Sequence, residues 1–232
     1  MADPVFSFFK VQTREEALAH LARFARLPAE AVGLNEALGR ITAVEVKSPE
    51  NLPTFRRSTM DGFAVVARDV FGASESSPTE LTIVGEVAMG KPAGIVLRSG
   101  ETARVWTGGM LPDGADAVVM LEYSREVDGE IVELTRPAAP GTNVTDVGED
   151  VAAGQLVLPA GRRLRAQDLG LLSALGVTRV DVVRRPKVAI LSTGNELVAA
   201  DVTPAPGQIR DVNTHTLAAL VTDLGEIGRA HV

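Results

Sequence analysis

The sequence predicts a mixed α and β fold, in which β-rich domains are followed by the start of an α/β domain with a parallel sheet. Short runs of β-branched residues, separated by Gly, Pro and Asp, occupy residues 50–145. A continuous apolar run at 187–192 is typical of a strand buried on both faces of a parallel sheet. With 232 residues, 45% of them hydrophobic, the chain can form the cores of one to two domains.

An amphipathic helix is expected near the N-terminus, over residues 14–26. Thr13 and Glu16 have the spacing of a capping box, in which a hydroxyl and a carboxylate satisfy backbone donors at the helix start. Apolar residues follow at helical spacing, and Pro28 is expected to end the helix.

The middle of the chain is expected to hold short strands and one hairpin. An irregular segment at 32–40 leads into a strand at 41–46. At 127–130 an Asp-Gly pair tolerates the positive φ angles of a tight turn, so a hairpin is expected there. The strands predicted further on are 81–84, 102–106, 117–121 and 130–134.

The C-terminal part is expected to begin an α/β domain. One helix is predicted at 166–175, with Gly176 at its left-handed end. The apolar strand at 187–192 is followed by a glycine turn and by a helix at 214–224 with an apolar face. Because no second parallel strand is recognised after it, the domain is expected to be unfinished and the chain to be an N-terminal fragment.

Composition excludes several classes of function. The chain has no cysteine, which excludes disulfides, zinc–thiolate sites, iron–sulfur clusters and a cysteine nucleophile. A formal charge of −7 argues against a nucleic-acid partner, which needs a basic surface. No apolar run approaches the roughly 18 residues that span a bilayer, and no signal-peptide core is present. We therefore expect a cytoplasmic protein with no nucleic-acid and no membrane partner.

Glycine loops at strand ends carry the first candidate residues. Asp61 could bind a cation or act as an acid or base, with Ser58, Arg56 and Arg57 holding an anion, although an Asp-Gly turn with solvated arginines is the alternative. The segment Thr107-Gly108-Gly109 could bring N–H groups and a hydroxyl to an oxyanion, or could be a glycine connection between strands. Asp150 offers the oxygen ligands that suit Mg²⁺, or belongs to a solvated acidic turn.

A second group follows the apolar strand. The segment Ser192-Thr193-Gly194-Asn195-Glu196 stands at its carboxyl end, where open α/β sheets bind ligands. Its hydroxyls and glycine suit a phosphate or a heterocycle, while a helix N-cap with a first-turn glutamate is the alternative. Asp211 and Asn213 could orient a ligand, and a capped helix start explains Asn213 equally well. Together these loops favour a phosphate-bearing small ligand held through a divalent cation.

Taken in order, six segments make the chain similar to the molybdopterin molybdenumtransferases, the molybdenum insertase family related to the E domain of gephyrin. They are LNEALGR (34–40), STMDGFA (58–64), TGG (107–109) with PDGADAVV (112–119), GEDV (148–151), PKVAILSTGNELV (186–198) and PGQIRD (206–211).

The resemblance implies an elongated, multidomain, homodimeric enzyme of molybdenum cofactor biosynthesis. Such enzymes insert molybdate into adenylylated molybdopterin and release AMP in a Mg²⁺-dependent reaction. The lack of cysteine fits, because the sulfur ligands belong to the substrate. Carried over residue by residue, the resemblance implies catalytic roles for Asp61, Thr107, Asp150 and Glu196, with Asp61 and Asp150 as metal ligands. The implied substrate-binding residues are Ser58, Gly108, Gly109, Ser192, Thr193, Gly194 and Asp211.

Four parts are predicted on this basis. They are an N-terminal helix in 1–30 that packs on the α/β domain, a β-rich linker and dimerisation domain (31–49 and 146–183), an inserted β-rich domain (50–145), and an incomplete α/β molybdopterin-binding domain (184–232). Because the family's active site lies between domains of two subunits, a fragment alone is expected to bind molybdopterin weakly and to insert no metal. The alternatives are a non-catalytic dimerising scaffold of the gephyrin type and a nucleotide-binding protein.

Overall fold

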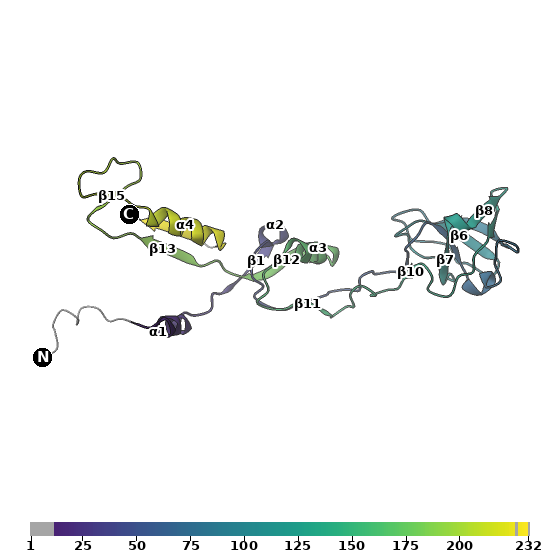
Figure 1. Ribbon diagram of the computed structural model, residues 1–232. Coiled ribbons are helices and arrows are strands. Elements are labelled where there is room, and N and C mark those ends of the chain that lie inside the picture. The colour runs from purple at the N-terminus through teal and green to yellow at the C-terminus, as the bar shows by residue number, and fades with distance from the viewer. Residues whose placement is uncertain (1–11, 226, 232) are drawn as a thin grey trace. The chain divides into compact units, whose positions relative to one another are not determined.

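The computed structural model describes residues 12–225 and the backbone of 227–231, and the chain divides into two compact units. The first unit comprises residues up to Val44, Ala160–Leu169 and the segment from Thr178 onward. The second comprises Glu45–Pro159 and Gly170–Val177. Figure 1 labels elements of both units where there is room. Residues 1–11 of the predicted N-terminal part lie outside the described residues.

A six-stranded mixed sheet forms the centre of the second unit, in the order β7-β4-β6-β5-β9-β8. Neighbouring strands are antiparallel except β5 and β6, which are parallel. The strands are β4 (Gly62–Val65), β5 (Thr79–Glu86), β6 (Glu101–Val105), β7 (Ala117–Met120), β8 (Ser124–Val127) and β9 (Ile131–Leu134). The strands expected in this region are confirmed. So is the hairpin, whose turn residues Asp128 and Gly129 have φ angles of 53° and 77°.

Strand β4 is buried on both faces. Along it, Phe63 and Val65 belong to one apolar cluster, while Ala64 belongs to a second cluster that includes Ala103 and Val105. Side chains alternate across a strand, so the two clusters lie on opposite faces of the sheet. The segment that carries Asp61 therefore leads directly into the most buried strand of this unit.

Shorter elements complete the second unit. They are β2 (Val46–Lys47) paired with β11 (Leu156–Leu158), β3 (Arg57–Ser58) paired with β10 (Val144–Thr145), and the 3-10 helices η3 (Ala67–Val70) and η4 (Leu121–Tyr123). The strand predicted at 41–46 is wrong in extent. Ile41 forms an isolated bridge with Arg163, and Thr42 forms one with Val182. Because these two partners lie in different segments, residues 41–46 do not form one continuous strand.

The first unit begins with a helix shorter than predicted. The capping box is confirmed, because the N–H of Glu16 donates to Thr13 Oγ1 at 3.2 Å and the N–H of Thr13 donates to Glu16 Oε2 at 2.9 Å. The helix α1 (Arg14–Ala19) then gives way to the 3-10 helix η2 (His20–Arg23). None of its residues is buried, and a short helix without packing is marginal in water.

An antiparallel pair, β1 (Ala29–Gly33) with β12 (Arg179–Val183), follows. The segment 32–40, expected to be irregular, holds the end of β1 and the short helix α2 (Leu34–Ala37). The helix predicted at 166–175 is confirmed as α3 (Ala166–Ala174), and Gly176 after it has a φ of +68°.

The C-terminal segment contains two parallel pairs and one helix. They are β13 (Lys187–Leu191) with β16 (Ile227–His231), β14 (Leu197–Val198) with β15 (Ile209–Arg210), and α4 (Asn213–Asp223). The expectation that no second parallel strand follows is wrong, because β16 pairs with β13 although its sequence is not a continuous apolar run. Burial of β13 on both faces is wrong as well, since only Ile190 in this strand is buried. In the described part of the chain, no helix has both the length and the apolar character that crossing a membrane requires.

Candidate functional site

Asp61 and Thr107 are brought together by the pairing of two strands. Gly62, the first residue of β4, lies opposite Val105, the last residue of β6. Because these strands are antiparallel, the residue before β4 and the loop after β6 meet at the same end of the sheet. There Thr107 donates both its backbone N–H and its hydroxyl to Asp61 Oδ1, each at 2.7 Å.

The Thr107 loop is fixed by Ser58. Gly108 N–H donates to the Ser58 carbonyl at 2.8 Å, and Ser58 N–H donates to the Gly109 carbonyl at 2.9 Å. Gly108 has a φ of +82°, and a Cβ on Gly109 would lie 2.9 Å from the Trp106 carbonyl oxygen, so the loop requires both glycines. The Ser58 hydroxyl is buried, donates to the Met60 carbonyl and accepts from the Met60 N–H, so it stabilises the conformation of this loop.

The Asp61 carboxylate is ionised and exposed. The backbone N–H of Thr107, and then its hydroxyl, hold the pKa of Asp61 below its ordinary value, with burial opposing. Both of these bonds end on Oδ1. Within the described chain, Oδ2 accepts no hydrogen bond, so it is available to a ligand.

An open pocket of about 370 Å³ lies beside this carboxylate. Its lining residues are Met60, Asp61, Thr107, Met120, Leu121 and Glu122. Glu122 places a second carboxylate in the pocket, although no motif in the sequence points to this residue. The one signal available was an acid directly after the strand predicted at 117–121.

Asp150 is held in a different set of contacts. Its Oδ2 accepts from Arg57 Nη2 at 3.4 Å, and its N–H donates to the Leu52 carbonyl at 3.0 Å. The adjacent ion pair, between Arg56 Nε and Asp146 Oδ1 at 2.9 Å, joins the same two segments. Among the described contacts, none links Asp150 to Asp61 or Thr107.

The second unit has two exposed carboxylates, Asp61 and Asp150, but no preformed metal centre among its described residues. In the described residues, no three His, Cys, Asp or Glu side chains gather into a metal-binding group. Mg²⁺ is commonly bound by one or two carboxylates together with substrate phosphates and waters. Asp61 Oδ2 accepts no hydrogen bond in the described chain, and Asp150 keeps one oxygen that Arg57 does not contact, but no described contact brings these two carboxylates together.

In the first unit, Asp211 and Thr214 form a buried pair at the start of α4. Thr214 N–H donates to Asp211 Oδ1 at 3.1 Å, the Thr214 hydroxyl donates to Asp211 Oδ2, and Ser192 Oγ lies 2.6 Å from Thr214 Oγ1. These hydroxyl and backbone bonds from Thr214 lower the pKa of Asp211. Asp211 thus caps the helix. The interpretation of Asn213 as the cap is wrong, because Asn213 is the first helical residue.

The segment 192–196 is a loop with a turn at Asn195 and Glu196. Its N-cap interpretation is wrong, because the chain continues into β14 and no described helix starts there. A Cβ on Gly194 would lie 2.7 Å from Glu196 Oε1, so the Glu196 carboxylate lies over the Gly194 backbone. Thr193 and Glu196 are exposed. In the second unit the structure thus joins Ser58, Asp61 and the Thr107 loop and leaves Asp150 in separate contacts, while residues 192–196 and Asp211 lie in the first unit.

A family model of the MoeA N-terminal region (domain I and II) matches residues 12–176. A molybdopterin molybdenumtransferase of Nostoc is 41% identical over 196 residues, which cover 84% of this chain and 45% of the relative. Molybdopterin molybdenumtransferase 2 of Mycobacterium tuberculosis is 36% identical over 217 residues, which cover 93% of this chain and 52% of the relative. The chain thus spans about half the length of the curated relatives it matches.

The comparison with solved structures agrees with the comparison of sequences. Two crystal structures of a molybdopterin biosynthesis MoeA protein from Pyrococcus horikoshii are similar to this chain. The first has a TM-score of 0.84 at 41% identity and is covered over 56% of its length, with 95% of this chain aligned. The second has a TM-score of 0.87 at 36% identity and is covered over 58%, with 94% of this chain aligned.

Proposed function

We propose the function of this chain from the premise that it belongs to the MoeA family, whose N-terminal region it matches. Its relatives are named molybdopterin molybdenumtransferases. We infer that the chain serves molybdenum cofactor biosynthesis as a transferase, acting in the cytoplasm as a homodimer. The reaction inserts molybdate into adenylylated molybdopterin, with cleavage of the adenylyl phosphate linkage and release of AMP.

The observation that carries this proposal is the ionised Asp61 carboxylate in its pocket, held by two hydrogen bonds from Thr107. One oxygen is committed to Thr107, which leaves the other for the ligand. A scaffold that only dimerises has no need of a carboxylate oriented in this way. Thr107 donates both its backbone N–H and its hydroxyl to Asp61, so we assign it the role of positioning that carboxylate.

Magnesium would neutralise phosphate charge on the bound substrate. Asp61 and Asp150 would each offer it one carboxylate oxygen, since both are exposed. In the first unit, Glu196 and the hydroxyl of Thr193 are exposed for contact with the pterin. Ser192 and Asp211 lie within the hydrogen-bonded start of α4, and we propose that they hold this loop in place.

Replacing Asp61 by asparagine tests the proposal. The neutral amide removes the anionic oxygen, and loss of a charged hydrogen bond or metal contact is expected to weaken binding of adenylylated molybdopterin with Mg²⁺ about tenfold or more. Isothermal titration calorimetry measures the effect. Asp113→Asn is the matched control, because Asp113 is an exposed acid of the same unit outside the pocket. Equal affinity for the Asp61 variant and the unchanged protein would remove Asp61 from the site.

Changing Thr107 tests its positioning role separately. Thr107→Val keeps the backbone donor and removes the hydroxyl, so the pKa of Asp61 is expected to rise toward its ordinary value. Thr107→Ser retains the hydroxyl and should keep the lower pKa. Carbon-13 NMR titration of the Asp61 carboxyl reads this directly. An unchanged pKa in Thr107→Val would show that the hydroxyl does not act on Asp61.

A further inference from the structure

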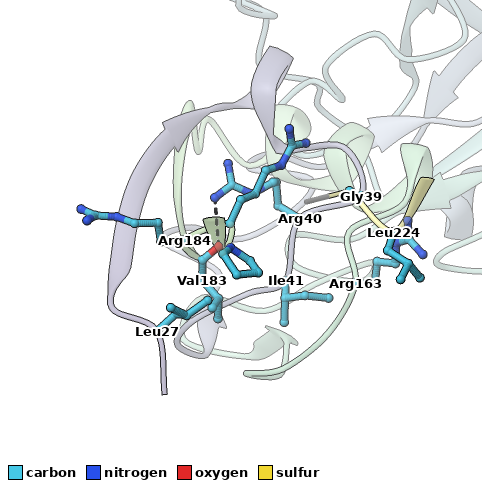
Figure 2. A pocket seen from close by; sticks show the side chains of 11 residues that line it. Leu27, Gly39, Arg40, Ile41, Arg163, Val183, Arg184 and Leu224 are labelled. Atoms are coloured by element: carbon cyan, nitrogen blue, oxygen red, sulfur yellow. Dashed lines mark hydrogen bonds between the residues drawn. The ribbon is translucent and has the colours of Figure 1, made fainter. Parts of the chain in front are cut away.

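The first unit contains a pocket of about 300 Å³ whose lining includes several arginine side chains, among them Arg40, Arg163 and Arg184 (Figure 2). Arg40, Arg163, Arg184 and Arg185 all line it, and we call it the arginine pocket. It lies in the unit that does not contain Asp61, and none of its lining residues belongs to the proposed molybdopterin site.

Backbone hydrogen bonds hold the walls of this pocket. Val183 N–H donates to the Ile41 carbonyl at 2.7 Å, and Gly39 N–H donates to the Leu164 carbonyl at 2.9 Å. Arg184 N–H donates to the Pro28 carbonyl at 2.9 Å. The arginines therefore come from three chain segments whose backbones are tied to one framework.

Among the described residues, Glu30 is the one acid that pairs with these arginines. Arg40 is 8% exposed, forms an ion pair with Glu30 and donates to the Val183 carbonyl at 2.9 Å, the bond drawn dashed in Figure 2. The Glu30 carboxylate also lies 3.7 Å from Arg184 Nε. Arg163 and Arg185 are exposed, and neither forms an ion pair with a described residue. The guanidinium of Arg163 lies beside Gly39, with Nη2 3.8 Å from where a Cβ would stand.

This excess of positive charge is unusual in a chain with a formal charge of −7. Like charges held around one pocket repel each other unless an anion lies between them. The planar fork of arginine matches the oxygens of phosphate and can bind them through two parallel hydrogen bonds. We propose that the arginine pocket binds a phosphate-bearing small ligand, with Arg163 and Arg185 as direct hydrogen-bond donors to it. Arg40, held by Glu30 and the Val183 carbonyl, forms a fixed part of the pocket wall.

Pyrophosphate is the probe that tests this site. Added to the full nitrogen-15-labelled chain, it is expected to shift the amide signals of Gly39, Ile41 and Arg184. The double variant Arg163→Gln/Arg185→Gln should bind pyrophosphate at least about tenfold more weakly, because two charged donors are lost. Both side chains are exposed and make no ion pair with described residues, so the variant should keep the melting temperature of the parent protein.

Arg98→Gln is the matched control, since it removes an exposed arginine from the other unit. It should leave the affinity for pyrophosphate unchanged. Shifts confined to the Asp61 pocket would overturn the proposal, and so would equal affinity in the double variant and the parent. The Asp61→Asn variant should still bind pyrophosphate here, which separates failure of this site from failure of the proposed function.

Two further titrations, one with AMP and one with inorganic phosphate, identify the source of the phosphate group. Tighter binding of AMP than of inorganic phosphate at these amides would indicate a nucleotide, and the reverse would indicate the free ion. Either result supports the proposal. An acidic peptide or an oligonucleotide that shifts these amides, where pyrophosphate does not, would overturn it in favour of a macromolecular partner.

Discussion

Replacing Gly62 by alanine is expected to lower the free energy of unfolding of the second unit by about 3 kcal/mol or more. Built on the present backbone, the new Cβ would lie 2.0 Å from the Val119 carbonyl oxygen and 3.0 Å from the Met120 Cα. Both atoms belong to the backbone of β7, so no side chain can turn away to make room. The strand β4 would have to move, although all its residues are buried.

The measurement is urea unfolding followed by the fluorescence of Trp106, the only tryptophan in the chain, which directly follows β6. Gly170→Ala is the control. Its Cβ would meet nothing within 4 Å, and alanine in place of a helical glycine is expected to stabilise by about 0.5–1 kcal/mol. A loss in Gly62→Ala no larger than about 0.5 kcal/mol would contradict the close approach of β4 and β7.

The same substitution is also expected to weaken the site. Gly62 follows Asp61 directly, and Leu121 N–H donates to the Asp61 carbonyl at 3.0 Å. A displaced β4 would carry the Asp61 carboxylate away from Thr107. The pKa of Asp61 in a folded Gly62→Ala variant should therefore lie closer to its ordinary value.

Asp168→Ala is the second change expected to have a large effect, at about 2 kcal/mol in the free energy of unfolding. The carboxylate is buried and accepts from Arg162 Nη2 at 2.8 Å, and from the Arg165 backbone N–H at 2.9 Å at the start of α3. Removing it leaves Arg162, one-third exposed, without its ion pair and removes a cap from the helix. Asp201→Ala, at an exposed position of the same unit, should be close to neutral.

The pH dependence of this effect follows from the pKa of Asp168. Hydrogen bonds from Arg165, and then from Arg162, hold that pKa well below its ordinary value despite the opposing effect of burial. A depressed folded-state pKa means that the stabilisation is complete above the unfolded pKa, about 3.9, and is lost as the pH falls below it. The difference between parent and variant should therefore be constant from pH 7 to about pH 5 and shrink toward pH 2. A difference that does not change over this range would show that the ion pairs do not stabilise the fold.

Much of the fold follows from local patterns. The strands of the mixed sheet, the Asp-Gly hairpin and α3 with Gly176 depend on neighbouring residues, so the sequence alone locates them. The strand β16 does not follow in this way, because its pairing with β13 depends on a distant partner and not on its own apolar pattern. Helix α1 ends early for a similar reason. Helical spacing cannot tell whether an apolar face finds a surface to pack against.

The sequence predicts that acidic and hydroxyl side chains from distant loops meet at one ligand, but it does not give their geometry; the described contacts join Asp61 with Thr107 and leave Asp150 apart. Motif segments identified Asp61 and Thr107, but their direct hydrogen bonds depend on the register of β4 against β6. Glu122 stands alone in the sequence, and the arginines of the arginine pocket come from separate segments. Neither therefore forms a motif with a characteristic spacing. Asp211 was identified as a ligand candidate, and only its contact with Thr214 revealed its capping role.

The pairing of Asp61 with Thr107 links residues that are 46 positions apart in the chain. The Thr107 amide hydrogen is therefore protected from exchange with solvent only while β4 and β6 remain side by side. In a chain whose central sheet opens, this proton exchanges together with those of the sheet and not with those of an independent loop. Loss of the β4–β6 pairing would therefore also release the Asp61 carboxylate from Thr107.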